Sequence, residues 1–191
     1  ELYTSIWANK NLLDKLQEPV LGLKEARRFL QDPENLLEKY CDFLTHDDFV
    51  PHNMRVQGND VVVLDHSSLI LGNKYESWAR FLNFMILYGR ELDHLLSKFI
   101  KENRGEEEYT VLRLMRIYKI SFLLNFYAKA IKKTEGNLFK ITDNRLKMWT
   151  KILKCILEDK EIPKELIDEH HKILEENRSV EEKKRHKEIS G

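Results

Sequence analysis

The stretch that decides the fold is FLTHDDFVPHNMRVQGNDVVVLDHSS, residues 43–68. It gathers carboxylates, histidines and asparagines around one short apolar run, residues 61–63. Such a segment has two interpretations: a site for chemistry, or a polar turn that precedes a buried strand. Little of the remaining sequence bears on function, so the choice between the two decides the functional prediction.

The second half of this stretch has the pattern of a small β-hairpin. Residues 54–57 form a short extended piece, and Gly58-Asn59-Asp60 is typical of a turn. The three valines that follow are β-branched, and their run is too short and too apolar for an exposed helix. We therefore expect a hairpin whose second arm is buried.

Helices are expected on both sides of the hairpin, because the chain has only seven glycines and four prolines. Before it, helical pieces are interrupted at Pro19 and Pro33, with Asp32 as a cap. After it, residues 74–89 read as a helix that ends at Gly89. The next helix, 90–105, places five apolar side chains on one face: Leu92, Leu95, Leu96, Phe99 and Ile100.

The last three predicted helices differ in polarity. Residues 109–133 are almost wholly apolar and predict a central buried helix. Residues 143–159 carry an apolar stripe behind an Asp143 cap, and Pro163 opens the final helix. The sequence thus predicts a mainly α fold with a small β-hairpin, spanning residues 1–174, and a charged tail at 175–191.

Composition limits the partners of this 191-residue chain. The 32 Lys and Arg residues balance the 32 Asp and Glu residues, so no global field attracts nucleic acid or an anionic membrane, and we expect neither as a partner. No apolar run reaches bilayer length. Cys41 and Cys155 form no disulfide framework, which favours a reducing, cytoplasmic location. Oligomeric state is not indicated.

Three oxygen-bearing side chains in the opening stretch match the needs of phosphoryl transfer. His46, Asp48 and Asn53 form H-x-D-x-x-x-x-N, and Asp65 ends the apolar run twelve residues after Asn53. That reaction needs one carboxylate beside the attacking hydroxyl, and further oxygens that hold Mg²⁺ against the phosphates. A loop followed by a hairpin can bring Asp48, Asn53 and Asp65 together, so the pattern indicates a magnesium and nucleotide site.

The segment HDDFVPHN followed by VVVLDH resembles the catalytic loop and metal motif of the aminoglycoside phosphotransferase and choline kinase family, small-molecule kinases with a protein-kinase-like fold. Pro51 occupies the family's frequent proline position, and GNKYESWARFL, residues 72–82, is similar to its following turn and helix. The resemblance implies that Asp48 is the catalytic base, that Asn53 and Asp65 bind Mg²⁺, and that His46 braces the loop.

The resemblance also implies the helical C-terminal lobe of a protein-kinase-like α+β fold, with ATP and Mg²⁺ as cofactors and a small hydroxyl compound as substrate. Nothing before Cys41 has the pattern of the family's β-rich nucleotide-binding lobe, and the chain begins at Glu1. We therefore expect that this lobe belongs to a longer parent protein. A non-catalytic, kinase-derived scaffold or regulatory domain is the alternative.

The sequence departs from the family pattern at three places. Asp47 stands where the family usually has glycine, and could raise the pKa of its neighbour or point to solvent. His66 replaces a frequent aromatic residue. The following helix normally offers an Asp that braces the catalytic loop, and here Glu76 or Ser77 would have to serve.

Other interpretations of single residues stay open at this stage. A metal-dependent phosphohydrolase of the His-Asp type would use the HDD segment with histidines on separate helices: His94, His170 and His171. The basic stripe of Arg113, Arg116 and Lys119 reads as a solvated helix face, or as a grip for an acidic substrate. His52 and His66 are read as ordinary loop residues rather than as metal ligands. Trp78, Phe81 and Phe84 are read as core residues rather than as a stacking platform.

Overall fold

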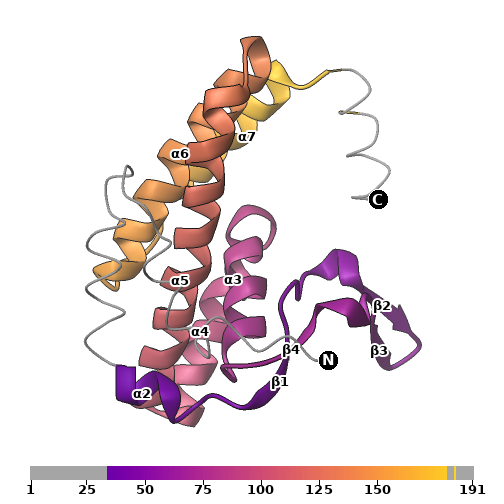
Figure 1. The fold of residues 1–191 in the computed structure, drawn as a ribbon, viewed down its shortest axis with the longest axis vertical. Helices are drawn as coiled ribbons and strands as arrows, with labels where there is room; N and C mark the ends of the chain where they lie inside the picture. The colour runs from indigo at the N-terminus through magenta and orange to yellow at the C-terminus, as the bar shows by residue number, and fades with distance from the viewer. Residues whose placement is uncertain (1–33, 180–182, 184–191) are drawn as a thin grey trace.

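The computed structural model describes residues 34–179 and residue 183 (Figure 1). The predicted helical pieces around Pro19 and Pro33 lie outside this range, apart from the short helix α2, Glu34–Glu38. The helices that follow the β region are α3 (Glu76–Tyr88), α4 (Arg90–Arg104), α5 (Glu106–Ala130), α6 (Gly136–Leu157) and α7 (Lys164–Asn177). None of the helices described is both long enough and apolar enough to cross a bilayer.

Helix α5 is the centre of the bundle and packs against α3, α4 and α6, while α7 packs on α6. In Figure 1, α6 and α7 run beside the upper part of α5, and α3 and α4 lie beside its lower part. Leu114, Ile117 and Ile120 of α5 are all within 1% of complete burial. The prediction of a central buried helix is confirmed, and its burial all round explains why it has no amphipathic pattern.

Two of the predicted helix ends are confirmed and one is wrong. Helix α3 ends at the C-cap Gly89, and Pro163 is the N-cap of α7. Helix α6 begins at Gly136 rather than at Asp143. Because the helical stretch 137–142 contains no breaker, the carboxylate of Asp143 lies within the helix and binds Lys147 one turn later at 2.7 Å.

The apolar stripe of α4 faces solvent more than the prediction implied. Leu95 is 59% exposed and Phe99 is 46% exposed, whereas Ile100 is buried. Helix α4 turns a more polar face toward α5, because its Asp93 pairs with Arg116 of α5 at 2.9 Å. A buried ion pair thus sets the rotation of α4 against the preference of its apolar residues.

The β region consists of two separate antiparallel pairs. Strand β2 (Met54–Gln57) pairs with β3 (Asp60–Val63), with Met54 opposite Val63, so the predicted hairpin is confirmed. Strand β1 (Phe43–His46) pairs with β4 (Leu69–Gly72), which the sequence did not predict. Single-turn 3₁₀ helices at Pro51–Asn53 and His66–Ser68 connect the two pairs.

The expectation that the second arm of the hairpin is buried is wrong. Val61 is 61% exposed and Val62 is 44% exposed. In Figure 1 the hairpin projects from the side of the bundle, in agreement with this exposure. The valines are therefore explained by β-branched propensity rather than by burial.

The basic stripe of α5 is neither a solvated face nor an open grip. The Arg116 side chain is 8% exposed and the Lys119 side chain is 12% exposed. Arg113 donates to the carbonyl of Ile156 at 2.9 Å and pairs with Asp159 at 3.3 Å. Each cation has an acidic partner, so all three hold neighbouring segments onto α5.

Replacement of Arg116 by Met should destabilise the protein strongly, because it leaves the carboxylate of Asp93 buried without its cation. We expect a loss of about 3–5 kcal/mol in the free energy of unfolding, measured by urea denaturation. The matched control is Lys98→Ala, which removes an exposed pair with Glu102 and should cost at most about 0.5 kcal/mol. Equal losses for the two variants would contradict this role for Arg116.

Candidate functional site

The loop after β1 is closed by main-chain hydrogen bonds that bring its two ends together. The N–H of Asp47 donates to the carbonyl of Ser68 at 2.8 Å, and the N–H of Leu64 donates to the carbonyl of Asn53 at 2.8 Å. His46 is 3% exposed, and its Nε2 donates to the Leu64 carbonyl at 3.0 Å. His46 thus links the end of β1 to the residue that follows the hairpin.

Asp48 and Asn53 are in direct contact. The amide nitrogen of Asn53 donates to the main-chain carbonyl of Asp48 at 2.9 Å and to its carboxylate at 3.1 Å. These bonds use the nitrogen, so the amide oxygen of Asn53 has no hydrogen-bond partner among the residues described. That oxygen is the atom through which an asparagine binds a hard cation.

Asp65 follows directly after the main-chain pair of Asn53 and Leu64, so the ladder of the hairpin brings it next to Asn53. Its backbone is left-handed, with φ 57°, a conformation that Asp adopts more readily than most residues. Its carboxylate accepts hydrogen bonds from Ser67 at 2.5 Å and from Ser68 at 2.6 Å. These two hydroxyl donors lower the pKa of Asp65 from its ordinary value.

Helix α3 supplies a partner for Asp48 that the sequence analysis missed. Arg80 binds the carboxylate of Asp48 through Nε at 2.9 Å and through a terminal nitrogen at 2.7 Å. Both nitrogens of Arg80 contact Oδ1, and Asn53 donates to Oδ2, so each oxygen of the carboxylate has a donor. Helical spacing gave a signal: Arg80 lies three residues after Ser77 and four after Glu76, on the same face of α3.

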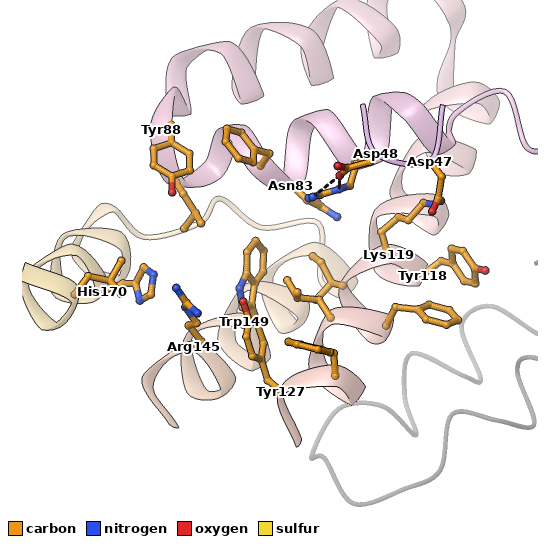
Figure 2. Close-up of a pocket in the computed structure, with 18 of the residues that line it drawn as sticks. Asp47, Asp48, Asn83, Tyr88, Tyr118, Lys119, Tyr127, Arg145, Trp149 and His170 are labelled. Carbon is orange, nitrogen blue, oxygen red and sulfur yellow. Dashed lines mark hydrogen bonds and ion pairs between the residues drawn. The ribbon is translucent and has the colours of Figure 1, made fainter. Parts of the chain in front are cut away.

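Of the two candidate bracing residues at the start of α3, Ser77 contacts the loop directly and Glu76 is linked to it only through Lys119. The Ser77 hydroxyl accepts from the His46 N–H at 2.8 Å and lies 3.2 Å from its carbonyl. Glu76 is fully buried and pairs with Lys119 at 3.1 Å, and Lys119 also binds Asp47. The extra carboxylate of Asp47 is thus held by a cation of α5 (Figure 2).

Alternative metal sites find little support in the geometry. Within the described part of the chain, no three His, Cys, Asp or Glu side chains converge closely enough to hold a metal ion. His52 packs edge-on against Phe84, with ring centroids 5.4 Å apart. His170 lies far from Asp47 and Asp48 in Figure 2, so the HDD segment and this histidine do not form a His-Asp phosphohydrolase centre. The set of Asp48, Asn53 and Asp65 is of another kind, since one of its oxygens comes from an amide.

A cavity of about 610 Å³ opens beside Asp47 and Asp48 and extends between α3, α5, α6 and α7. Figure 2 shows Trp149 in its middle, with Asp48 and Lys119 at one end and His170 at the other. Seven of its lining residues are aromatic: Phe84, Tyr88, Tyr118, Phe122, Phe126, Tyr127 and Trp149. The sequence could not indicate this cavity, because its residues come from four helices and share no local pattern.

The aromatic residues of α3 that the sequence assigned to the core have separate positions. Phe84 lines the cavity and stacks on Tyr88, with ring centroids 4.7 Å apart. Phe81 packs against Phe49 of the loop at 5.9 Å. Trp78 is 37% exposed and lies outside the cavity.

Comparison with protein-family models, with curated proteins and with solved structures found no match to this chain.

Removal of both hydroxyls in Ser67→Ala/Ser68→Ala should raise the pKa of Asp65 toward its ordinary value, because two donors to the ionised carboxylate are lost. The titration of the Asp65 Cγ signal by NMR measures this shift. The pKa of Asp65 is lower in the folded protein than in the unfolded chain, so these hydrogen bonds stabilise the folded protein at pH values above the unfolded pKa. That stabilisation is lost as the pH falls through the folded pKa. The control Thr150→Ala removes a hydroxyl of α6 and should leave the Asp65 titration unchanged; an equal shift there would contradict the assignment.

Proposed function

We propose that this chain is the C-terminal lobe of a small-molecule kinase, which transfers the γ-phosphate of ATP to an alcohol with the help of Mg²⁺. One observation carries the proposal: Asn53 contacts Asp48 through its side chain and is paired through its main chain to the segment that ends in Asp65. Asp48 and Asn53 are thus in contact, and the main-chain pair of Asn53 with Leu64 brings the backbone before Asp65 to the same end of the hairpin. The resemblance to aminoglycoside phosphotransferases and choline kinases gives the same three residues their roles.

In this proposal Asp48 orients the hydroxyl of the acceptor and accepts its proton. The alcohol oxygen then forms a bond to the γ-phosphorus, and the bond to the bridging oxygen breaks, so that ADP leaves. Mg²⁺ held by the amide oxygen of Asn53 and the carboxylate of Asp65 would neutralise charge on the phosphates. Positioning and electrostatics supply most of the catalysis in this class of reaction.

The surroundings of Asp48 support the assignment. Arg80 and Asn53 hold its carboxylate from two directions, which gives a general base a fixed orientation. The aromatic cavity begins at the same carboxylate and has the size of a metabolite-binding site. An acceptor bound in this cavity would present its hydroxyl to Asp48.

Kinases of this class also need a β-rich lobe that covers the phosphates and supplies a lysine. The described residues contain only two two-stranded sheets, β1–β4 and β2–β3. The proposal therefore places the binding of adenine outside the described residues, and full activity is expected only with that lobe present.

A non-catalytic, kinase-derived scaffold is the second candidate. The observation in its favour is that the key carboxylates already have protein partners: Arg80 for Asp48, and Ser67 and Ser68 for Asp65. Calorimetry with Mg-ATP on the natural full-length protein separates the two candidates. A kinase binds Mg-ATP with measurable heat, whereas a scaffold of this kind does not.

Asp48→Asn and Asp65→Asn in the full-length protein should abolish phosphoryl transfer without unfolding the protein. Loss of a general base costs roughly 10²–10⁴ in rate, and Asn keeps both the size of Asp and its tolerance of the left-handed backbone at residue 65. ADP release in the presence of a panel of small alcohols measures the rate, and circular dichroism checks the fold.

The matched control is Asp60→Asn, which changes an exposed carboxylate at the start of β3 in the same hairpin and should retain activity. If Asp65→Asn keeps near-normal transfer at limiting Mg²⁺, residue 65 is not a metal ligand.

A further inference from the structure

The end of the cavity far from Asp48 is basic. Arg145 of α6, His170 of α7 and Arg178, the residue after α7, line it together. Figure 2 shows Arg145 and His170 on the opposite side of Trp149 from Asp48. The cavity thus joins a carboxylate site at one end to a group of basic side chains at the other.

The two arginines differ from the buried cations of the fold in having no counter-ion. Arg113, Arg116 and Lys119 each pair with a carboxylate. Arg145 lies 5.7 Å from the ring of Tyr127 and has no acidic partner within the described residues, and the same holds for Arg178. Both side chains are half-buried. Two partly desolvated guanidinium groups that share a cavity without an anion repel each other, and a bound anion would relieve this repulsion.

His170 lies near the same two arginines, and their charges affect its pKa. It is 2% exposed, and its Nδ1 donates to the side-chain oxygen of Asn144 at 2.5 Å. Burial, followed by the charge of Arg145, lowers the pKa of His170 to about 4. The imidazole is therefore neutral at pH 7 and adds a polar wall without adding a third charge.

Between the two ends the walls carry aromatic and aliphatic side chains, and Trp149 is 4% exposed. Such walls bind a flat or apolar body. A cationic amine bound deep in the cavity would meet Arg145 and Arg178 rather than carboxylates. The charge pattern therefore argues against aminoglycosides and choline-like amines as acceptors.

We propose that the cavity binds a compound with an apolar or aromatic body and an anionic group, a carboxylate or a phosphate, which Arg145 and Arg178 hold. Its alcohol lies at Asp48, and only this last assignment rests on the proposed function. The arginine pair recognises the negatively charged oxygens that a carboxylate and a phosphate have in common, since guanidinium groups bind both kinds of anion through paired N–H donors.

A matched set of probes tests the binding without any need for turnover. The probes are 4'-(hydroxymethyl)biphenyl-4-carboxylate, its carboxamide, its phosphonate, and the analogue with an aminomethyl group in place of the carboxylate. Calorimetry with the full chain should show the carboxylate or the phosphonate at least tenfold tighter than the amide, and the amine weakest. The stronger of the two anions identifies the kind of group that the natural ligand carries.

Arg145→Gln and Arg178→Gln should each weaken the anionic probes at least fivefold and change the affinity of the amide less than twofold. Lys151→Gln, an exposed cation on α6 outside the cavity, is the matched control and should change neither. Thermal melts show whether each variant folds; if one does not, the other variant and the probe series on the unmodified protein still decide.

Equal affinity for the anionic and neutral probes, or anion binding that both arginine variants retain, would overturn the proposal, and so would no measurable binding of either anion at 1 mM. Its failure is distinct from that of the kinase proposal. Arginine-dependent anion binding without any phosphoryl transfer by the full-length protein leaves the anion site standing and removes the kinase. The opposite result is phosphorylation of neutral alcohols that is lost in Asp48→Asn, with no preference for anions. That result leaves the kinase standing and removes the anion site.

Discussion

The candidate site depends on one constraint: a polar loop is fastened to an apolar bundle by side chains of two helices. Ser77 and Arg80 of α3 hold the loop at His46 and Asp48, and Lys119 of α5 holds it at Asp47. Lys119 also compensates the fully buried Glu76, whose charge would otherwise be costly in the interior. The packing of α3 on α5 therefore sets both the stability of the bundle and the position of the loop carboxylates.

The charge pattern separates residues that hold the fold from residues available to a ligand. The three cations of the α5 stripe, Arg113, Arg116 and Lys119, recur every three residues, each is mostly buried, and each meets a carboxylate from another segment. The arginines at the far end of the cavity have no such partner in the described chain. In a protein with equal numbers of acidic and basic residues, this local imbalance indicates a binding role more directly than the net charge does.

Features set by neighbouring residues could be predicted from the sequence, and features set by distant contacts could not. The hairpin follows from its turn residues and β-branched run, and the helix ends at Gly89 and Pro163 follow from backbone preference. That Asp48 and Asn53 lie close together agrees with the expectation that a loop followed by a hairpin brings them together. Pairing of β1 with β4 joins two four-residue runs across 22 intervening positions, and nothing local indicates it. Burial of the α5 cations was missed because the acids that pair with them lie on other elements.

The cation site proposed for Asn53 and Asp65 can be tested most directly with paramagnetic Mn²⁺ in place of Mg²⁺, observed by NMR on the isotope-labelled chain. If the two side chains share one cation, low concentrations of Mn²⁺ should broaden the Asn53 side-chain amide and the Asp65 backbone amide before other signals, and Asp65→Asn should remove both effects. The two residues do not form one metal site if the broadening at Asn53 persists unchanged in Asp65→Asn. The same conclusion follows if the Asn53 signal broadens no more than the signals of exposed Asp and Glu residues elsewhere in the protein.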